Sequence, residues 1–196
     1  MTNKSNAGRP LRLSALMLRA WRLARTRALW AWRMNHLGRR SVVGRCRLAP
    51  NPGSIWIGDH TVLSDGWTLA DLKPEEAQAT PRIRIGSHCT ILHDFQCNAG
   101  VSVEIQDHVL IAPRVFVTDS DHIFGQNEHP TESCEYRSAP VVIEHDCWLG
   151  VNAVILKGVT LGHHSIVGAG AVVARSFPAF STVTGVPARA RECQAA

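Results

Sequence analysis

The stretch IEHDCWLGVNAVILKGVTLGHHSIVGAGAVV, residues 143–173, decides the fold, because an aliphatic side chain returns in it at every sixth position. An α-helix would scatter residues of that spacing around its surface, so the period excludes a helix. Short strands joined by tight corners, three to each turn of a solenoid, would instead point one side chain of every hexad inward. The aliphatic positions are Ile143, Leu149, Ile155, Leu161, Val167 and Val173.

The same spacing continues upstream as far as residue 57. Between the aliphatic residues lie short corner sequences rich in Gly, Asp and His, which tolerate positive φ better than other residues do. Small or aliphatic residues two positions before each hexad aliphatic would share its inward face. The sequence therefore predicts an all-β solenoid, a parallel β-helix of hexapeptide repeats. The upstream hexads are Ile57, Leu63 and Leu69, then Ile85, Ile91, Cys97 and Val103, and, after a slip of two residues, Ile105, Ile111 and Val117.

Two polar stretches interrupt the hexads and are expected to leave the solenoid as loops. The first covers residues 70–82, and the second, longer one covers about 118–140. A solenoid can extrude a loop at a corner without losing its stack, and long loops on rigid scaffolds are where binding and chemistry concentrate. The second loop is therefore the first place to search for a functional site.

The charge of the 196-residue chain is unevenly divided. Its formal net charge is +5, yet residues 1–50 hold 12 of the 21 Lys and Arg and none of the 16 Asp and Glu. The remainder has 9 basic against 16 acidic residues, a net charge of −7. A surface that follows phosphates needs positive charge, so nucleic-acid binding by the body is not expected. We expect three parts: a basic helical segment at 1–50, a β-helix domain at 51–190 and a tail at 191–196.

The basic segment has the pattern of an amphipathic helix with aromatic residues beside its apolar face. Two interpretations remain open: the helix packs on the open end of the β-helix, or residues 10–34 contact a membrane surface. The sequence lacks a run long enough to span a membrane and does not have the form of a signal peptide. Its six cysteines show no paired spacing, so we predict reduced thiols and a cytoplasmic protein, placed at the inner membrane face if the second interpretation holds. The apolar side is Leu13, Met17, Ala20, Trp21, Ala24, Ala28, Ala31 and Trp32, opposite Arg12, Arg19, Arg22, Arg25 and Arg33.

Histidine is the usual general base, and ten are present. Seven occupy corner positions, where turn geometry alone explains them, and His36 belongs to the basic segment. His122 and His129 remain, both in the loop at 118–140. His122 directly follows a strand that can hold it still, so it is the preferred base and His129 the second choice. The corner histidines are His60, His88, His93, His108, His145, His163 and His164.

Trp148 lies five residues after Ile143, so its side chain should point outward from the solenoid. A large aromatic residue in that position needs cover. It is either part of an interface between subunits or a wall of the active site, and the two interpretations are compatible.

Residues 140–189, ending in GVPAR, resemble the C-terminal half of the bacterial hexapeptide acyltransferases, which fold as left-handed β-helices. The likeness extends over about residues 55–190 and is nearest to galactoside and maltose O-acetyltransferases and to those of O-antigen and exopolysaccharide synthesis. The segment VLIAPRVFVTDSDH, residues 109–122, resembles the catalytic stretch of that family and ends on its catalytic histidine.

This resemblance implies a homotrimer with active sites between subunits, acetyl-CoA as co-substrate and a saccharide acceptor. It implies that His122 deprotonates the acceptor hydroxyl, which attacks the thioester directly, and that the Val151 N–H supports the oxyanion. Asp119 and Asp121 would orient the imidazole, or alternatively cap the loop. The remaining implied positions are Trp148, Gly150, Val151, Ala169, Ala174, Arg175 and Arg189 for acetyl-CoA, and Asp94, Gln96 and Asn98 for the acceptor.

Three other functions stay open. N-acetylation of an amino-sugar nucleotide also needs a base. A zinc enzyme resembling the carbonic anhydrases of this fold would need three histidine ligands converging between subunits, and a non-catalytic scaffold would need none of these groups. We expect no metal site, since only His122 and His129 lie outside corners in the body.

Overall fold

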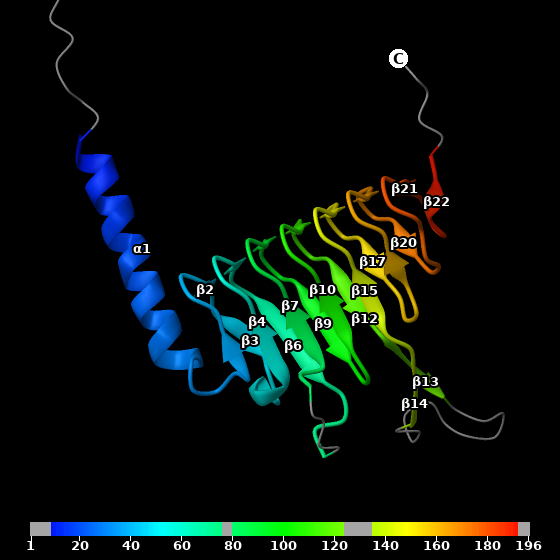
Figure 1. The fold of residues 1–196 in the computed structure, drawn as a ribbon, viewed down its shortest axis with the longest axis horizontal. Coiled ribbons are helices and arrows are strands. Elements are labelled where there is room, and N and C mark those ends of the chain that lie inside the picture. Colours follow the sequence, from blue (N-terminus) through cyan, green and yellow to red (C-terminus); the bar gives the residue numbers. More distant parts are fainter. Residues whose placement is uncertain (1–8, 76–79, 124–134, 192–196) are drawn as a thin grey trace, which may run out of the picture.

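The computed structural model describes residues 9–75, 80–123 and 135–191, of which the side chains of 9–16 and 19 are left undescribed. It is the left-handed parallel β-helix that the sequence predicts, with one long helix at its N-terminal end (Figure 1). Three sheets form the faces of the solenoid, and their strands are parallel except for the last strand of sheet B, which is antiparallel to its neighbour. The chain visits the sheets in the order A, B, C in each coil as far as residue 173.

Sheet A contains β1 (His36–Leu37), β4 (Ile55–Ile57), β7 (Ile83–Ile85), β10 (Val103–Ile105), β15 (Val141–Ile143) and β18 (Thr160–Leu161). Sheet B contains β2 (Val42–Val43), β5 (Val62–Leu63), β8 (Thr90–Ile91), β11 (Leu110–Ile111), β16 (Trp148–Leu149), β19 (Ile166–Val167), β21 (Thr182–Thr184) and β22 (Arg189–Ala190). Sheet C contains β3 (Cys46–Leu48), β6 (Trp67–Asp71), β9 (Gln96–Ala99), β12 (Phe116–Thr118), β17 (Val154–Ile155) and β20 (Val172–Val173). A short 3-10 helix, Pro52–Ser54, precedes β4.

The core is built from the hexad aliphatic residues. All sixteen positions from Ile57 to Val173 that the spacing predicts are at most 1% exposed, which confirms the repeat. Register follows from it, since Ile105 lies between Ile85 and Ile143 in sheet A. Val101 is a correction: it was expected on the inward face, yet it is 38% exposed, because the slip of two residues places it in a corner.

The corner chemistry is also confirmed. The residues of the corner between sheets A and B take positive φ at one position in successive coils, among them His60, His88 and His108, at 57°, 58° and 60°. These histidines serve the turn, as predicted.

The solenoid begins before the predicted boundary at residue 50. Strands β1 and β2 already pair with β4 and β5, and β3 pairs with β6, so residues 36–48 form a first coil. Leu37, Val43 and Ala49 keep the spacing of six and are the signal that would have shown it. The 22-residue helix α1 (Arg9–Trp30) accounts for the rest of the basic segment.

Helix α1 closes the open end of the core with the last part of its length. Thr26 is fully buried; its Oγ1 donates to Val43 O and accepts from Val43 N–H (3.2 and 2.9 Å). Arg27 donates to the carbonyl oxygens of Leu37 and Gly38, at 2.9 and 2.8 Å. The Trp30 ring lies 5.1 Å from that of the buried Trp67. The first interpretation of the basic segment, packing on the solenoid, is therefore correct for this part of α1.

The predicted apolar side of α1 is a different face and stays uncovered. Met17, Trp21 and Trp32 are 69%, 58% and 73% exposed, and the alanines between them are exposed as well. Among the described residues, no helix combines the length and the apolar character that crossing a bilayer requires.

Candidate active site

The long loop leaves the solenoid between sheets C and A as a two-stranded antiparallel hairpin. Its strands are β13 (Ser120–Ile123) and β14 (Glu135–Ser138), and it projects from the body in Figure 1. His122 lies on β13, exposed to solvent, opposite Tyr136 in register and with the two ring centroids 4.6 Å apart. His129, the second choice for the base, lies outside the described residues.

Asp119 anchors the base of this hairpin. Its fully buried carboxylate accepts hydrogen bonds from the N–H groups of Gly100 and Val101 (2.7 and 2.8 Å) and from the Ser120 hydroxyl (2.5 Å). A carboxylate with three donors is held firmly. Of the two predicted roles of Asp119, the geometry shows the capping one, and among the described residues it makes no hydrogen bond to His122.

Asp121 holds the hairpin from its other side. Its Oδ2 lies 2.5 Å from Nζ of Lys157, which belongs to the corner between sheets C and A in the following coil. The carboxylate is half exposed and lines the same shallow hollow as His122 and Arg137. The hairpin therefore contacts the solenoid at two points, through Asp119 and through Asp121, and these contacts hold the strand that bears His122.

The predicted acetyl-binding residues lie on another edge. Trp148 points outward from sheet B, 48% exposed, as predicted, while Leu149 beside it is fully buried. Gly150 and Val151 follow in the corner between sheets B and C, directly beside Ala169: a Cβ added to Gly150 would come within 2.6 Å of the Ala169 nitrogen. Within the described part of the chain the Val151 N–H makes no backbone hydrogen bond.

The cationic candidates for the cofactor are both exposed. Arg175 lies after β20, at the corner between sheets C and A, with its guanidinium 5.2 Å from the Phe177 ring. Ala174, next to it, is exposed too. Arg189 lies in β22 and donates to the Ala188 carbonyl at 3.1 Å.

Two of the three acceptor candidates lie on β9 of sheet C, and the third, Asp94, lies in the corner between sheets B and C that precedes it. Gln96 and Asn98 face outward on β9, and the carbonyl of Asn98 accepts from the Asp119 N–H, which places it at the foot of the hairpin. Asp94 sits further away, in the corner before β9. The hydrogen bond to His93 (3.0 Å), more than the nearby Arg47 (3.4 Å), lowers the pKa of the Asp94 carboxyl.

In one chain these residues therefore form two groups. His122 and Arg175 follow the corner between sheets C and A, whereas Trp148, Val151 and Ala169 follow sheet B and the corner between B and C. The sequence named these five residues as candidates, but the fold of a single chain places them on two different edges.

Three of the cysteines, Cys89, Cys97 and Cys147, are buried in the core. Burial raises the pKa of the Cys89 and Cys147 thiols to about 11 and raises that of Cys97 further, so these thiols stay protonated near neutral pH.

A family model described as the hexapeptide repeat of succinyl-transferase matches residues 140–175. The chain carries the hexapeptide repeat. This hexapeptide-repeat chain is 34% identical over 110 residues to galactoside O-acetyltransferase of Escherichia coli, covering 53% of each protein. It is 37% identical over 97 residues to a putative lipopolysaccharide biosynthesis O-acetyl transferase of Escherichia coli, covering 45% of this chain and 48% of the relative. The chain spans about half the length of these two curated relatives.

Among solved structures, a hexapeptide-repeat acetyltransferase of Vibrio cholerae, complexed with acetyl-CoA, superposes with a TM-score of 0.60. It is 27% identical, and the alignment covers 96% of this chain and 92% of the other. The chain thus resembles hexapeptide-repeat acyltransferases in sequence and in fold.

Proposed function

We propose that this protein is an acetyl-CoA-dependent O-acetyltransferase that acts on a saccharide hydroxyl, in polysaccharide, lipopolysaccharide or glycoconjugate synthesis. The observation that carries the proposal is the exposed His122 imidazole on a hairpin braced through Asp119 and Asp121. The likeness to two O-acetyltransferases and to an acetyltransferase solved with acetyl-CoA supports the chemistry.

The proposed reaction is a direct transfer. His122 accepts the proton of the acceptor hydroxyl while that oxygen attacks the thioester carbonyl, and the Val151 N–H stabilises the oxyanion. The tetrahedral intermediate collapses with cleavage of the C–S bond, and the thiolate of CoA takes the proton back from the imidazolium. Arg175 and Arg189 would bind the phosphates of CoA, because a guanidinium keeps its positive charge and its donors match phosphate oxygens.

A homotrimer would complete this site. The two groups of residues lie on different edges of the solenoid, and outward apolar residues of sheet B, Leu110, Trp148 and Ile166, are 39–48% exposed. We propose that sheet B of one subunit packs beside the hairpin edge of the next, which brings Trp148 and Val151 opposite the neighbour's His122.

The decisive experiment is a screen of acceptors. The protein is incubated with acetyl-CoA and a panel of sugars, nucleotide sugars and their amino-sugar counterparts, and CoA release is followed with a thiol reagent. We expect release with at least one hydroxyl acceptor that lacks an amine. Release with amino sugars alone would replace O-acetylation by the N-acetyltransferase alternative, and no release with any acceptor would favour a scaffold.

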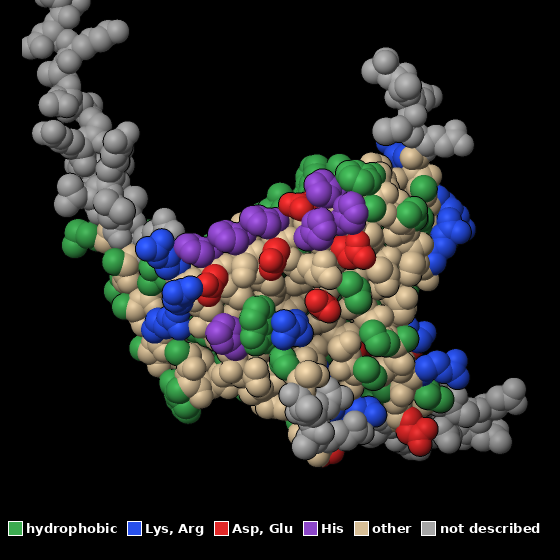
Figure 2. All heavy atoms as spheres, in the orientation of Figure 1, with side chains coloured by type: hydrophobic (Ala, Val, Ile, Leu, Met, Phe, Trp, Pro, Cys, Tyr) green, Lys and Arg blue, Asp and Glu red, His purple; other side chains and the backbone are tan. Residues whose placement is uncertain are grey.

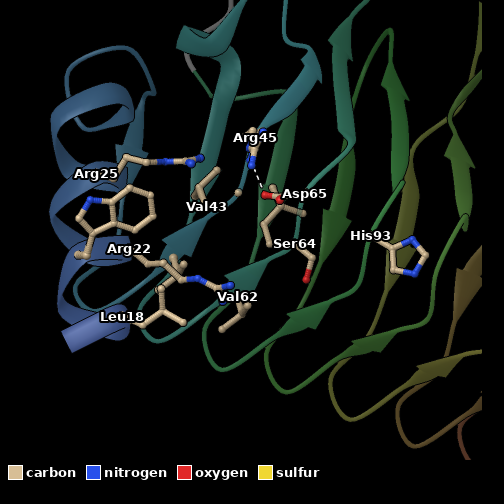
Figure 3. A pocket seen from close by; sticks show the side chains of 13 residues that line it. Leu18, Arg22, Arg25, Val43, Arg45, Val62, Ser64, Asp65 and His93 are labelled. Carbon is tan, nitrogen blue, oxygen red and sulfur yellow. Dashed lines mark hydrogen bonds between the residues drawn. The ribbon is translucent and has the colours of Figure 1, made fainter. Parts of the chain in front are cut away.

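We further propose that α1 holds the enzyme at an anionic membrane surface. Beside its uncovered apolar face, Arg22, Arg25 and Arg45 line a groove of about 360 Å³ between α1 and the first coils (Figure 3). Trp21 lies in the same groove, 5.7 Å from the Arg25 guanidinium. Exposed Trp beside Arg suits the headgroup region of a bilayer, where each basic residue contributes about 1 kcal/mol. Saccharides carried on lipids would be within reach of a protein held there.

The prediction is that the protein sediments with vesicles of phosphatidylglycerol but not with phosphatidylcholine alone. The double variant R22E/R25E should lose this binding, because it reverses two of the charges in the groove. R191E reverses one charge at an exposed arginine at the opposite end of the solenoid; it is the control for charge reversal outside the groove and should bind as wild type. If R22E/R25E binds as wild type, or changes the oligomeric state instead, α1 serves another partner.

A further inference from the structure

The corner between sheets A and B carries an unbroken file of side chains along the solenoid. Successive coils contribute His60, His88, His108, Asp146, His164 and Phe180, all at φ between 57° and 61°. Stacked coils repeat at the spacing of paired strands, about 4.8 Å, so neighbours in the file touch. His60, His88 and His108 stack at 4.9 Å, and histidines dominate this edge in Figure 2.

At Asp146 the file has a carboxylate in place of an imidazole. Two imidazoles lie near this carboxylate: His145, the preceding residue of the chain, and His164, in the same corner of the next coil. Nδ1 of His145 lies 2.7 Å from Oδ2 of Asp146, and Nε2 of His164 lies 3.8 Å from the same oxygen. One ligand atom from each residue falls within 4.8 Å of the others. All three side chains are partly exposed, at 39–48%, and therefore open to an ion from solution.

We propose that His145, Asp146 and His164 bind a divalent transition-metal ion of the zinc class. Two imidazole nitrogens and one carboxylate oxygen are typical ligands of zinc-class ions, whereas Mg²⁺ and Ca²⁺ prefer oxygen ligands alone. Bonds of about 2.0–2.2 Å to tetrahedral zinc require donor atoms about 3.3 Å apart. Rotations of exposed side chains suffice to reach that geometry, and water would complete the coordination.

Neighbouring rings hold His164 in the required orientation. Its Nδ1 lies 3.1 Å from Nδ1 of His163, so Nε2 is the nitrogen left to face Asp146. The Phe180 ring stacks on His164 at 5.1 Å, and His163 in turn stacks on His145 at 4.8 Å. Partners of this kind fix ring orientation, and losing one typically costs 10–100-fold in metal affinity. His163 is therefore a positioning residue of the site.

The ion would join two coils of the solenoid. His145 and Asp146 lie in the corner before β16, and His164 lies in the corner before β19, one coil further on. One ion bound to all three would therefore link these two corners. A metal ion that binds only the folded protein raises its Tm. The expected increase is about 5–10 °C at a metal concentration a hundred times the Kd. The ligands all come from one chain, unlike the three histidines of the zinc-enzyme alternative.

The test is calorimetric titration of chelator-treated protein with ZnCl₂, followed by thermal unfolding with and without zinc. Wild type should bind one ion per chain and gain stability. D146N and H164N should bind at least a hundredfold more weakly and show no zinc-dependent shift in Tm. H163A should bind about 10–100-fold more weakly. Asparagine tolerates positive φ, so both Asn variants preserve the corner.

H88N is the matched control: it removes a histidine of the same file, at the same φ, from outside the site. It should bind zinc as wild type does. The proposal is overturned if wild type takes up no zinc at 1 mM, if D146N and H164N bind like wild type, or if H88N loses binding as they do. Acetyl transfer does not depend on this ion in our proposal, so a failure here leaves the proposed function untouched.

Discussion

Replacing His122 with alanine is expected to lower kcat for acetyl transfer by about 10²–10⁴-fold, the usual contribution of a general base. The imidazole is exposed on a hairpin whose base is held by other residues, so its removal should leave the fold and the oligomeric state unchanged. The measurement is steady-state CoA release with the acceptor found in the screen, alongside size exclusion and circular dichroism.

H93A and H129A frame this experiment. His93 is an exposed corner histidine, and its loss should leave kcat as in wild type. Full activity in H122A together with loss of activity in H129A would move the base to the second candidate. Full activity in both would remove general-base catalysis by this loop altogether.

A second large effect is expected at the ion pair between Arg82 and Asp71. Both side chains are only 2% exposed, and Nε of Arg82 lies 3.3 Å from Oδ1 of Asp71 and donates to the Gly100 carbonyl at 3.1 Å. The variant R82M keeps the volume but leaves the buried carboxylate without this cation. Such a loss costs about 3–5 kcal/mol, which lowers Tm by about 6–20 °C in a chain of this size.

Thermal and urea unfolding of R82M measure this prediction. The double variant D71N/R82M should recover part of the loss, because it removes the uncompensated charge. R84M changes a partly exposed neighbour that packs on Trp56 (4.4 Å), and should cost much less. A Tm for R82M equal to that of wild type would contradict the assigned role of the pair.

The repeat was predictable because one geometric rule places all the hexad residues of the core. Each strand turns one hexad side chain inward, so a spacing of six in the sequence becomes a column in space. Where the rule is interrupted, as at Val101, the prediction was wrong. The first coil was missed for a different reason: its hexad, Leu37, Val43 and Ala49, lies among arginines that favoured assigning the whole segment to the helix.

The packing of α1 was beyond the reach of the helical wheel. The wheel selects the most apolar face, yet the face that docks contains Thr26 and Arg27, whose hydrogen-bonding groups match the edge strands they meet. Such a match depends on the backbone groups at the end of the solenoid, which spacing alone does not reveal.

The positions of individual candidate residues were predictable, but their arrangement was not. The exposed position of His122 and the outward position of Trp148 followed from the loop and the repeat. The choice between the two roles of Asp119 needed the positions of the Gly100 and Val101 N–H groups. The two groups of residues lie on different edges of the solenoid, and this separation became visible only in the folded structure.

The closed end of the solenoid bears on how far copies of this protein can aggregate. A bare end coil presents unpaired strand edges, onto which another solenoid could add and grow into a fibre. Thr26 and Arg27 occupy hydrogen-bonding groups of Val43, Leu37 and Gly38 on those edges, and Trp30 covers the core behind them. Helix α1 therefore covers strand edges onto which another copy could otherwise add end to end.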